Sequence, residues 1–214
     1  YRESYAAYHA LRWSGLSKKK SLLYGGAAGL LFQTPIEIFD GLYENWGFSW
    51  TDMIANTFGS ALFMSQEALF DEQVILMKFS YTPSIYPDYH SKLGENEINQ
   101  FFLDYNAHTY WLSMGIEKIS GASKIPKWLN LAIGYGANGM IGEFENPTWY
   151  QGEPFPDIQR YRQLLFSLDI NFAEVETNSR LLKRVFRAIN LIKIPFPTLE
   201  INQKNGLKFH PIYF

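Results

Sequence analysis

Hydrophobic residues recur with two different periods along the chain, and the period changes near residue 72. In residues 1–71 they recur every three or four positions, as on one face of an α-helix. This spacing predicts a first amphipathic helix that ends near Gly15. A short charged link, Lys18–Lys20, follows it. We expect the next helix, rich in glycine and alanine, over Ser21–Phe32.

Two further helix starts carry capping signals. Thr34–Glu37 is a capping box with proline at the first helical position, and it predicts a helix to about Asn45. Ser49–Asp52 resembles a second box, with aspartate in the place of glutamate, and it predicts a helix that ends near Phe70. The chain is therefore expected to begin with a helical segment over residues 1–71.

From Gln73 onward the period falls to two, which is the period of a β-strand. Apolar residues alternate with small or polar ones in at least six stretches, most clearly between Gln163 and Phe172. Asn205-Gly206 is a strong signal for a hairpin turn before the last strand. The pattern predicts an α+β protein in which residues 72–214 form an antiparallel barrel of about six to eight strands. One amphipathic helix interrupts the strands at about 178–192.

The strand pattern favours an outer-membrane β-barrel. Long strands with one apolar face and one small or polar face are typical of such barrels, which pair every backbone group without a free edge. The chain has 6 Trp, 14 Tyr and 17 Phe, which suits interfacial girdles, and the sequence ends on the aromatic Phe214, as outer-membrane barrels usually do. Pro211 is unfavourable in a regular last strand. A soluble barrel or sandwich would show the same alternation with its apolar face inward.

The amino-acid composition excludes several kinds of functional site. The 214 residues suffice for one large domain, and a net charge of −2 gives no argument for nucleic acid as a partner. The absence of cysteine excludes disulfides, thiolate metal sites and cysteine nucleophiles. The four histidines lack the spacing of a metal site, so we expect no metal and no cofactor. No uninterrupted apolar run reaches the eighteen or more residues of a transmembrane helix.

Carboxylates on two predicted helices are the candidates for catalysis. Glu37, Asp40 and Glu44 fall on one helical face, and Asp52 and Asn56 belong to a polar stripe on the next helix. If the stripes meet, these groups share a poorly solvated site that suits acid–base catalysis or a divalent metal. The alternative is structural, since Glu37 and Asp52 are each the third residue of a capping box.

The predicted helix at 178–192 is basic and amphipathic. Its cations are spaced as on one helical face, so this helix could lie in the membrane interface and contact lipid phosphates. A solvated basic face packed on the protein explains the pattern equally well. The candidate lipid-phosphate contacts are Arg180, Lys183, Arg184 and Arg187.

Several stretches resemble a Bacteroidota family of unknown function whose members are usually labelled predicted periplasmic lipoproteins. They are Tyr24–Gly26, Gln33–Gly41, Trp46–Asn56, Asp104–Ser113 and Pro126–Gly136. The resemblance implies a cell-envelope location and a segment that precedes Tyr1. It brings no established activity and therefore no catalytic residues.

Three functions fit these observations. The first is a non-enzymatic outer-membrane subunit or accessory of a larger envelope complex, with membrane lipid and other envelope proteins as partners and the helical segment on the periplasmic side. The second is a lipid- or cell-wall-modifying enzyme that uses the helical carboxylates. The third is a small pore or lipid-binding barrel.

Overall fold

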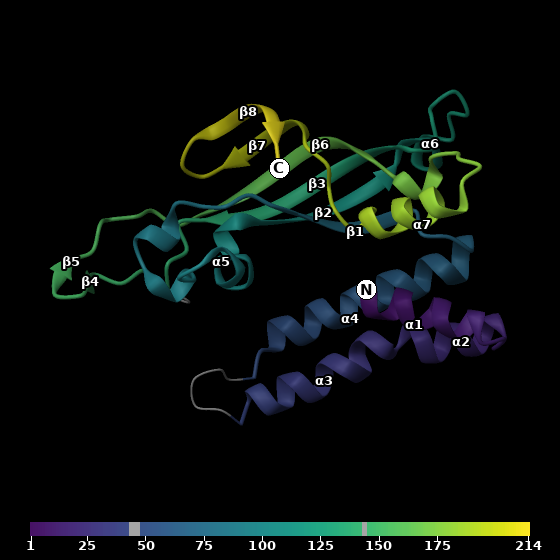
Figure 1. Cartoon of the computed structure of the whole chain (residues 1–214), viewed down its shortest axis with the longest axis horizontal. Coiled ribbons are helices and arrows are strands. Elements are labelled where there is room, and N and C mark those ends of the chain that lie inside the picture. The colour runs from purple at the N-terminus through teal and green to yellow at the C-terminus, as the bar shows by residue number, and fades with distance from the viewer. Residues whose placement is uncertain (43–47, 143–144) are drawn as a thin grey trace. The chain divides into compact units, whose positions relative to one another are not determined.

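The computed structural model describes residues 1–42, 48–142 and 145–214 of the chain. It confirms the α+β class, with helices first and an antiparallel sheet after them. The chain divides into two compact units, a helical unit of residues Tyr1–Val74 and a sheet unit of residues Ile75–Phe214 (Figure 1).

Four helices build the helical unit. They are α1 (Arg2–Trp13), α2 (Lys18–Gly26), α3 (Ala28–Asp40) and α4 (Trp50–Phe70). The cap predicted at Ser49 is present, because its Oγ accepts a hydrogen bond of 3.2 Å from the Asp52 N–H. Two other boundaries differ from prediction. The three lysines begin α2 and do not form a link, and the predicted capping box at Thr34 is wrong because Pro35 lies inside α3.

The chain stays helical past the expected break because Ala27, between α2 and α3, keeps right-handed helical torsion angles. Its carbonyl accepts a hydrogen bond of 3.0 Å from the Leu31 N–H. Proline removes one such bond without ending the helix. As a result Lys18–Phe39 forms one helical stretch of 22 residues, and an 18-residue window within it has a mean hydropathy of 1.2. By length and composition alone this stretch could cross a membrane, although it is not an uninterrupted apolar run; core helices and signal sequences pass the same test.

Small and polar residues face the interior of the helical unit. The Ser4 and Ser60 hydroxyls lie 3.2 Å apart in the buried interior. A Cβ at Gly25 would lie 2.5 Å from the Tyr8 Cα, so α1 and α2 can approach this closely only because Gly25 has no side chain. Burial and a hydrogen bond to Glu67 raise the pKa of Tyr8 to about 12. Large apolar side chains on α3 and α4 are exposed instead: Leu31, Phe32, Phe39, Trp50, Ile54 and Phe58.

Six antiparallel strands form the main sheet, in the order β1-β2-β3-β6-β7-β8. They are β1 (Ile75–Tyr81), β2 (His108–Gly115), β3 (Leu129–Asn138), β6 (Tyr161–Ile170), β7 (Phe196–Asn202) and β8 (Gly206–Tyr213). A separate small hairpin pairs β4 (Trp149–Tyr150) with β5 (Glu153–Pro154). The strand number agrees with the sequence pattern.

Short helices connect the strands at the two ends of the sheet. They are α5 (Glu97–Leu103), α6 (Ile116–Ser120) and α7 (Arg180–Ile189), with 3-10 turns η1 (Tyr86–Asp88), η2 (Ser91–Leu93), η3 (Tyr105–Ala107) and η4 (Phe172–Glu174). Within this unit, α5 and the β4–β5 hairpin lie at one end of the strands, and α6 and α7 lie at the other (Figure 1).

The edge strands of the sheet are β1 and β8, and no ladder between them is found in the part of the chain described. β8 includes Pro211, which an edge strand tolerates because one side of its backbone needs no partner. The free edge of β1 is partly covered, since Phe79 N–H donates to the Leu191 carbonyl and Lys193 N–H donates to the Phe79 carbonyl. The predicted closure into a barrel therefore has no hydrogen-bonded seam.

Candidate functional site

The two faces of the main sheet differ in chemistry and in burial. Residues alternate strictly between buried and more exposed positions along β1, β2, β6 and β7. The buried face carries most of the polar and charged side chains, including Lys78, Asn130, Gln163, Asp169, Glu200 and Asn202. A soluble sheet shows the opposite arrangement, with its apolar face buried.

An ion pair lies on the buried face. Lys78 Nζ lies 2.8 Å from Asp169 Oδ2, and both side chains are 0% exposed. The ammonium also donates to the Ile170 carbonyl at 2.7 Å, and Ser113 Oγ donates to Asp169 Oδ2 at 2.6 Å. The Asn130 amide donates to the Ser113 hydroxyl at 2.9 Å. These contacts link strands β1, β2, β3 and β6.

A second buried carboxylate joins strands β6, β7 and β8. Glu200 Oε1 accepts hydrogen bonds from Gln163 and Asn202 at 2.8 and 2.6 Å, and Glu200 Oε2 lies 2.6 Å from His210 Nε2. The carboxylate therefore has polar partners on both oxygens, as a buried charge requires. Its three partners come from β6, β7 and β8 and tie these strands together.

One aromatic side chain fills the space between these two clusters. Trp111 is buried, and its Nε1–H donates to Ser80 Oγ at 2.9 Å. The Lys193 ammonium lies 4.9 Å from the centroid of the indole, within the range of a cation–π contact. A Cβ at Gly134 would lie 2.6 Å from Trp111 Cε3, so the indole fits only because residue 134 has no side chain.

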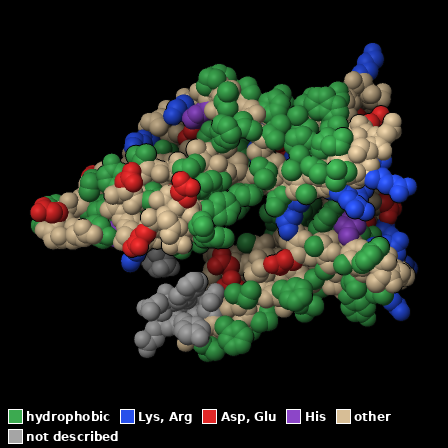
Figure 2. Space-filling model, viewed as in Figure 1, with side chains coloured by type: hydrophobic (Ala, Val, Ile, Leu, Met, Phe, Trp, Pro, Cys, Tyr) green, Lys and Arg blue, Asp and Glu red, His purple; other side chains and the backbone are tan. Residues whose placement is uncertain are grey.

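The other face of the sheet is apolar and exposed. Its side chains include Leu131, Leu164, Leu168, Leu199, Ile201 and Phe209, each at least 40% exposed. Figure 2 shows hydrophobic side chains gathered over the middle of the strands, with most charged side chains towards the strand ends. Monomeric soluble proteins rarely expose an apolar surface of this extent, which is typical of a surface that meets protein or lipid.

The catalytic candidates of the helical unit are placed on two helices. Glu37 is buried on α3, Asp52 is exposed in the first turn of α4, and Asn56 follows it one turn later. No hydrogen bond or ion pair joins these three side chains to one another. Asp40 belongs to α3, but its side chain and the whole of Glu44 lie outside the described residues. Among the described residues, no group of three or more carboxylates and histidines could hold a metal ion.

Helix α7 presents its predicted cations to solvent. Arg180, Lys183, Arg184 and Arg187 are all exposed. The apolar side of this helix is also uncovered, since Leu181, Leu182, Val185 and Ile189 are exposed, while Phe186 packs against Phe172 with ring centroids 5.8 Å apart. An amphipathic helix with both sides open to the surroundings suits the boundary between water and an apolar medium.

In the stretch that begins at Asp104, hydrogen bonds of Asp104 and Asn106 hold a loop in place. Asp104 Oδ2 accepts from Ser84 Oγ at 2.5 Å, and Oδ1 accepts from the backbone and the side-chain amide of Asn106 at 3.1 and 2.8 Å. Asn106 also exchanges two hydrogen bonds with the Met140 backbone, at 2.8 and 2.7 Å. These residues are therefore accounted for by loop structure.

Sequence reasoning did not single out Lys78, Asp169, Glu200 or His210 as a connected set. Their signal was a charged residue among the small and polar residues that alternate with apolar ones along each strand. Comparison of the chain with protein-family models, with curated proteins and with solved structures gives no match.

Proposed function

We propose that the protein is an outer-membrane protein whose sheet unit forms a small barrel in lipid, and that it serves as a non-enzymatic subunit or accessory of a larger envelope complex. The observation that carries this proposal is the reversed polarity of the sheet. Ion pairs and amides are buried on one face, and leucine, isoleucine and phenylalanine are exposed on the other. In a lipid bilayer this arrangement is the stable one, because apolar side chains meet acyl chains.

The geometry of the sheet edges supports a barrel. The antiparallel pairings lead from Tyr213 in β8 across the sheet to the beginning of β1, near Ile75. Phe214 nevertheless contacts Thr82, which follows the other end of β1, through a hydrogen bond of 3.2 Å. Tyr213 also meets Thr109 of β2, a strand that is not its neighbour, at 3.1 Å. Closing a sheet into a barrel requires such a stagger between its edges.

The filled interior supports a role other than conduction. Six strands enclose little space, and the buried face already carries large side chains such as Trp111 and Lys78. The carboxylates of the helical unit form no cluster among the described residues, which favours a subunit over an enzyme. The envelope location is also what the resemblance to the Bacteroidota family implies.

A single substitution on the exposed face tests the proposal. Leu168 is 41% exposed on the apolar face, in the second half of β6. In lipid, Leu168→Arg should destabilise the protein, by an amount that reaches about 2–4 kcal/mol at the bilayer midplane, and reduce its recovery in the membrane fraction. In water the same change at an exposed position should alter stability by no more than about 0.5 kcal/mol. Urea titration after reconstitution into vesicles measures the difference.

Ile85→Arg is the matched control, because Ile85 is exposed in a loop outside the strands and the change should be tolerated. Equal stability of both variants, with the wild-type protein recovered in the soluble fraction without detergent, would refute the proposal.

A further inference from the structure

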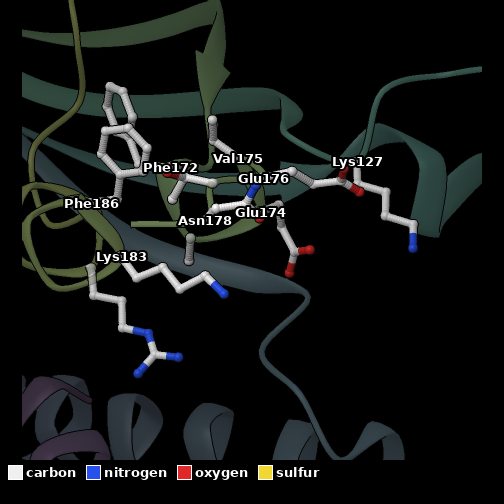
Figure 3. Close-up of a pocket in the computed structure, with 11 residues that line it drawn as sticks. Lys127, Phe172, Glu174, Val175, Glu176, Asn178, Lys183 and Phe186 are labelled. Atoms are coloured by element: carbon white, nitrogen blue, oxygen red, sulfur yellow. The ribbon is translucent and has the colours of Figure 1, made fainter. Parts of the chain in front are cut away.

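A pocket lies between α7 and the turn η4 that precedes it. Its volume is about 470 Å³, within the range of about 300–1,000 Å³ that small-ligand pockets usually have. Phe172, Val175 and Phe186 form most of its apolar part, and charged and uncharged polar side chains line the rest. Figure 3 shows the charged ends of Lys183 and Glu174 directed into the same space, with the two phenylalanine rings together at one side.

The pocket brings together charges of both signs. Lys127, Lys183 and Arg187 supply three cations, and Glu174 and Glu176 supply two carboxylates. Lys118 lies 3.7 Å from Glu174. Within the described residues, no hydrogen bond or ion pair joins the side chains of Lys127, Lys183, Arg187 or Glu176 to a protein partner. A purely anionic ligand would meet the carboxylates, so the lining fits a ligand that carries one anionic and one cationic group.

The surroundings of the pocket indicate where such a ligand would come from. The exposed apolar residues Leu181, Leu182 and Val185 lie on the same helix as the pocket cations Lys183 and Arg187. In an amphipathic helix at a membrane surface, the apolar side enters the acyl region and the cations remain at the headgroup level. The pocket would then lie at the depth of lipid headgroups.

We propose that this pocket binds the phosphoethanolamine headgroup of a membrane phospholipid, with its phosphate at Lys183 and Arg187 and its ammonium at Glu176. The inference that the pocket lies at the depth of lipid headgroups rests on the proposed function, whereas the charge pattern of the pocket is independent of it. Phosphate oxygens accept charge-assisted hydrogen bonds from guanidinium and ammonium groups, and a primary ammonium can donate three hydrogen bonds to carboxylates.

Calorimetric titration of the full chain in a neutral detergent tests this assignment. The probes are dihexanoyl phosphatidylethanolamine below its micelle-forming concentration, the corresponding phosphatidylglycerol, and free O-phosphoethanolamine. We expect the phosphatidylethanolamine to bind more tightly than the other two. Lys183→Gln and Glu176→Gln should each weaken its binding about tenfold, the usual scale for one charged hydrogen bond. Lys208→Gln removes an exposed charge from β8, outside the pocket lining, and should leave binding unchanged.

Three results would overturn the proposal. Equal or tighter binding of the phosphatidylglycerol would remove the requirement for an ammonium group, and full retention of binding by Glu176→Gln would do the same. Equal binding of free O-phosphoethanolamine would remove the lipid as the source of the headgroup. Because these probes need no bilayer, their binding is measurable even if the Leu168→Arg experiment refutes membrane insertion, so the two proposals can fail separately.

Discussion

Lys78 and Asp169 form an ion pair whose side chains are both fully buried, and each charge compensates the other. Removal of one member of a buried ion pair leaves a charge without compensation, which usually costs about 3–5 kcal/mol. Replacement of both members by apolar residues of similar size removes both charges and often costs much less. The pair is therefore a sensitive test of how strands β1 and β6 hold together.

We expect Lys78→Met to lower the free energy of unfolding by about 3–5 kcal/mol, and Lys78→Met combined with Asp169→Leu to lower it by clearly less. Urea titration of the reconstituted protein gives both values. If the double variant is less stable than the single one, the ion pair contributes net stabilisation and the argument from an uncompensated charge is wrong.

Sequence alternation predicted which residues share a face, but it could not predict their partners. Lys78 and Asp169 both fall on the small or polar positions of their strands. Their contact depends on how far the strands are staggered and how strongly the sheet curls, and neither property is encoded in the local period of a single strand. For the same reason Glu200 and His210 could be assigned to a hairpin but not to a shared hydrogen-bond network.

At the scale of elements, the β4–β5 hairpin is attached to the preceding loop through one histidine. The His90 ring lies 4.1 Å from the Tyr150 ring, and its Nδ1 accepts a hydrogen bond of 3.1 Å from the Lys92 N–H. Ser91 Oγ lies 2.9 Å from the Tyr150 hydroxyl. Because Nδ1 must stay unprotonated to accept, protonation of His90 removes the cap of η2 and disturbs this attachment.

Burial and the nearby Lys92 hold the pKa of His90 below its ordinary value of 6.5. A depressed histidine pKa means that its stabilising contribution is complete above pH 6.5 and is lost as the pH falls through the lower pKa of the folded protein. The protection factor of the Lys92 amide against hydrogen exchange should therefore fall on acidification. His90→Asn, which keeps a side-chain acceptor that does not titrate, should weaken this dependence; an equal loss of protection in that variant would exclude His90 as its cause.

Helix boundaries show a similar division between what the sequence specifies and what it does not. The cap at Ser49 was predictable because its hydrogen bond to the Asp52 N–H is local. The continuation of α3 through Pro35 was not predictable from the sequence. The helical turn before Pro35 already supplies hydrogen bonds that the proline does not interrupt. A capping signal in the sequence therefore predicts the start of a helix reliably only where the residues before it are not already helical.

At the scale of the whole molecule, both units bury polar groups as well as apolar ones, and both expose large apolar side chains. In the helical unit Ser4 and Ser60 meet in the interior beside Phe63, while Phe32, Ile54 and Phe58 remain exposed. Close packing through small residues with hydrogen bonds between helices is typical of helices that associate in an apolar environment. We propose that lipid or other proteins cover the exposed apolar surface of the helical unit.

The native mass of the tagged protein in mild detergent tests whether that cover includes protein. We expect extraction from outer membranes to yield a particle much larger than the 24.8 kDa chain, with a constant set of co-eluting envelope proteins identified by mass spectrometry. A monodisperse single chain with bound detergent would contradict the subunit role and shift the choice to lipid binding. Extraction with a harsher detergent is the control, because specific partners should then dissociate.

The hydrogen bond between Thr82 and Phe214 spans 132 residues of sequence, and this separation has a consequence for how the chain reaches its folded state. The two edges of the sheet can meet only after every intervening residue has been synthesised, so this contact forms late in folding. Contacts of such long range are slow to form, because the entropy of a large loop is lost before any contact compensates for it. During this delay the apolar strands are open to aggregation, so the newly made chain is expected to require a chaperone until its last strand is in place.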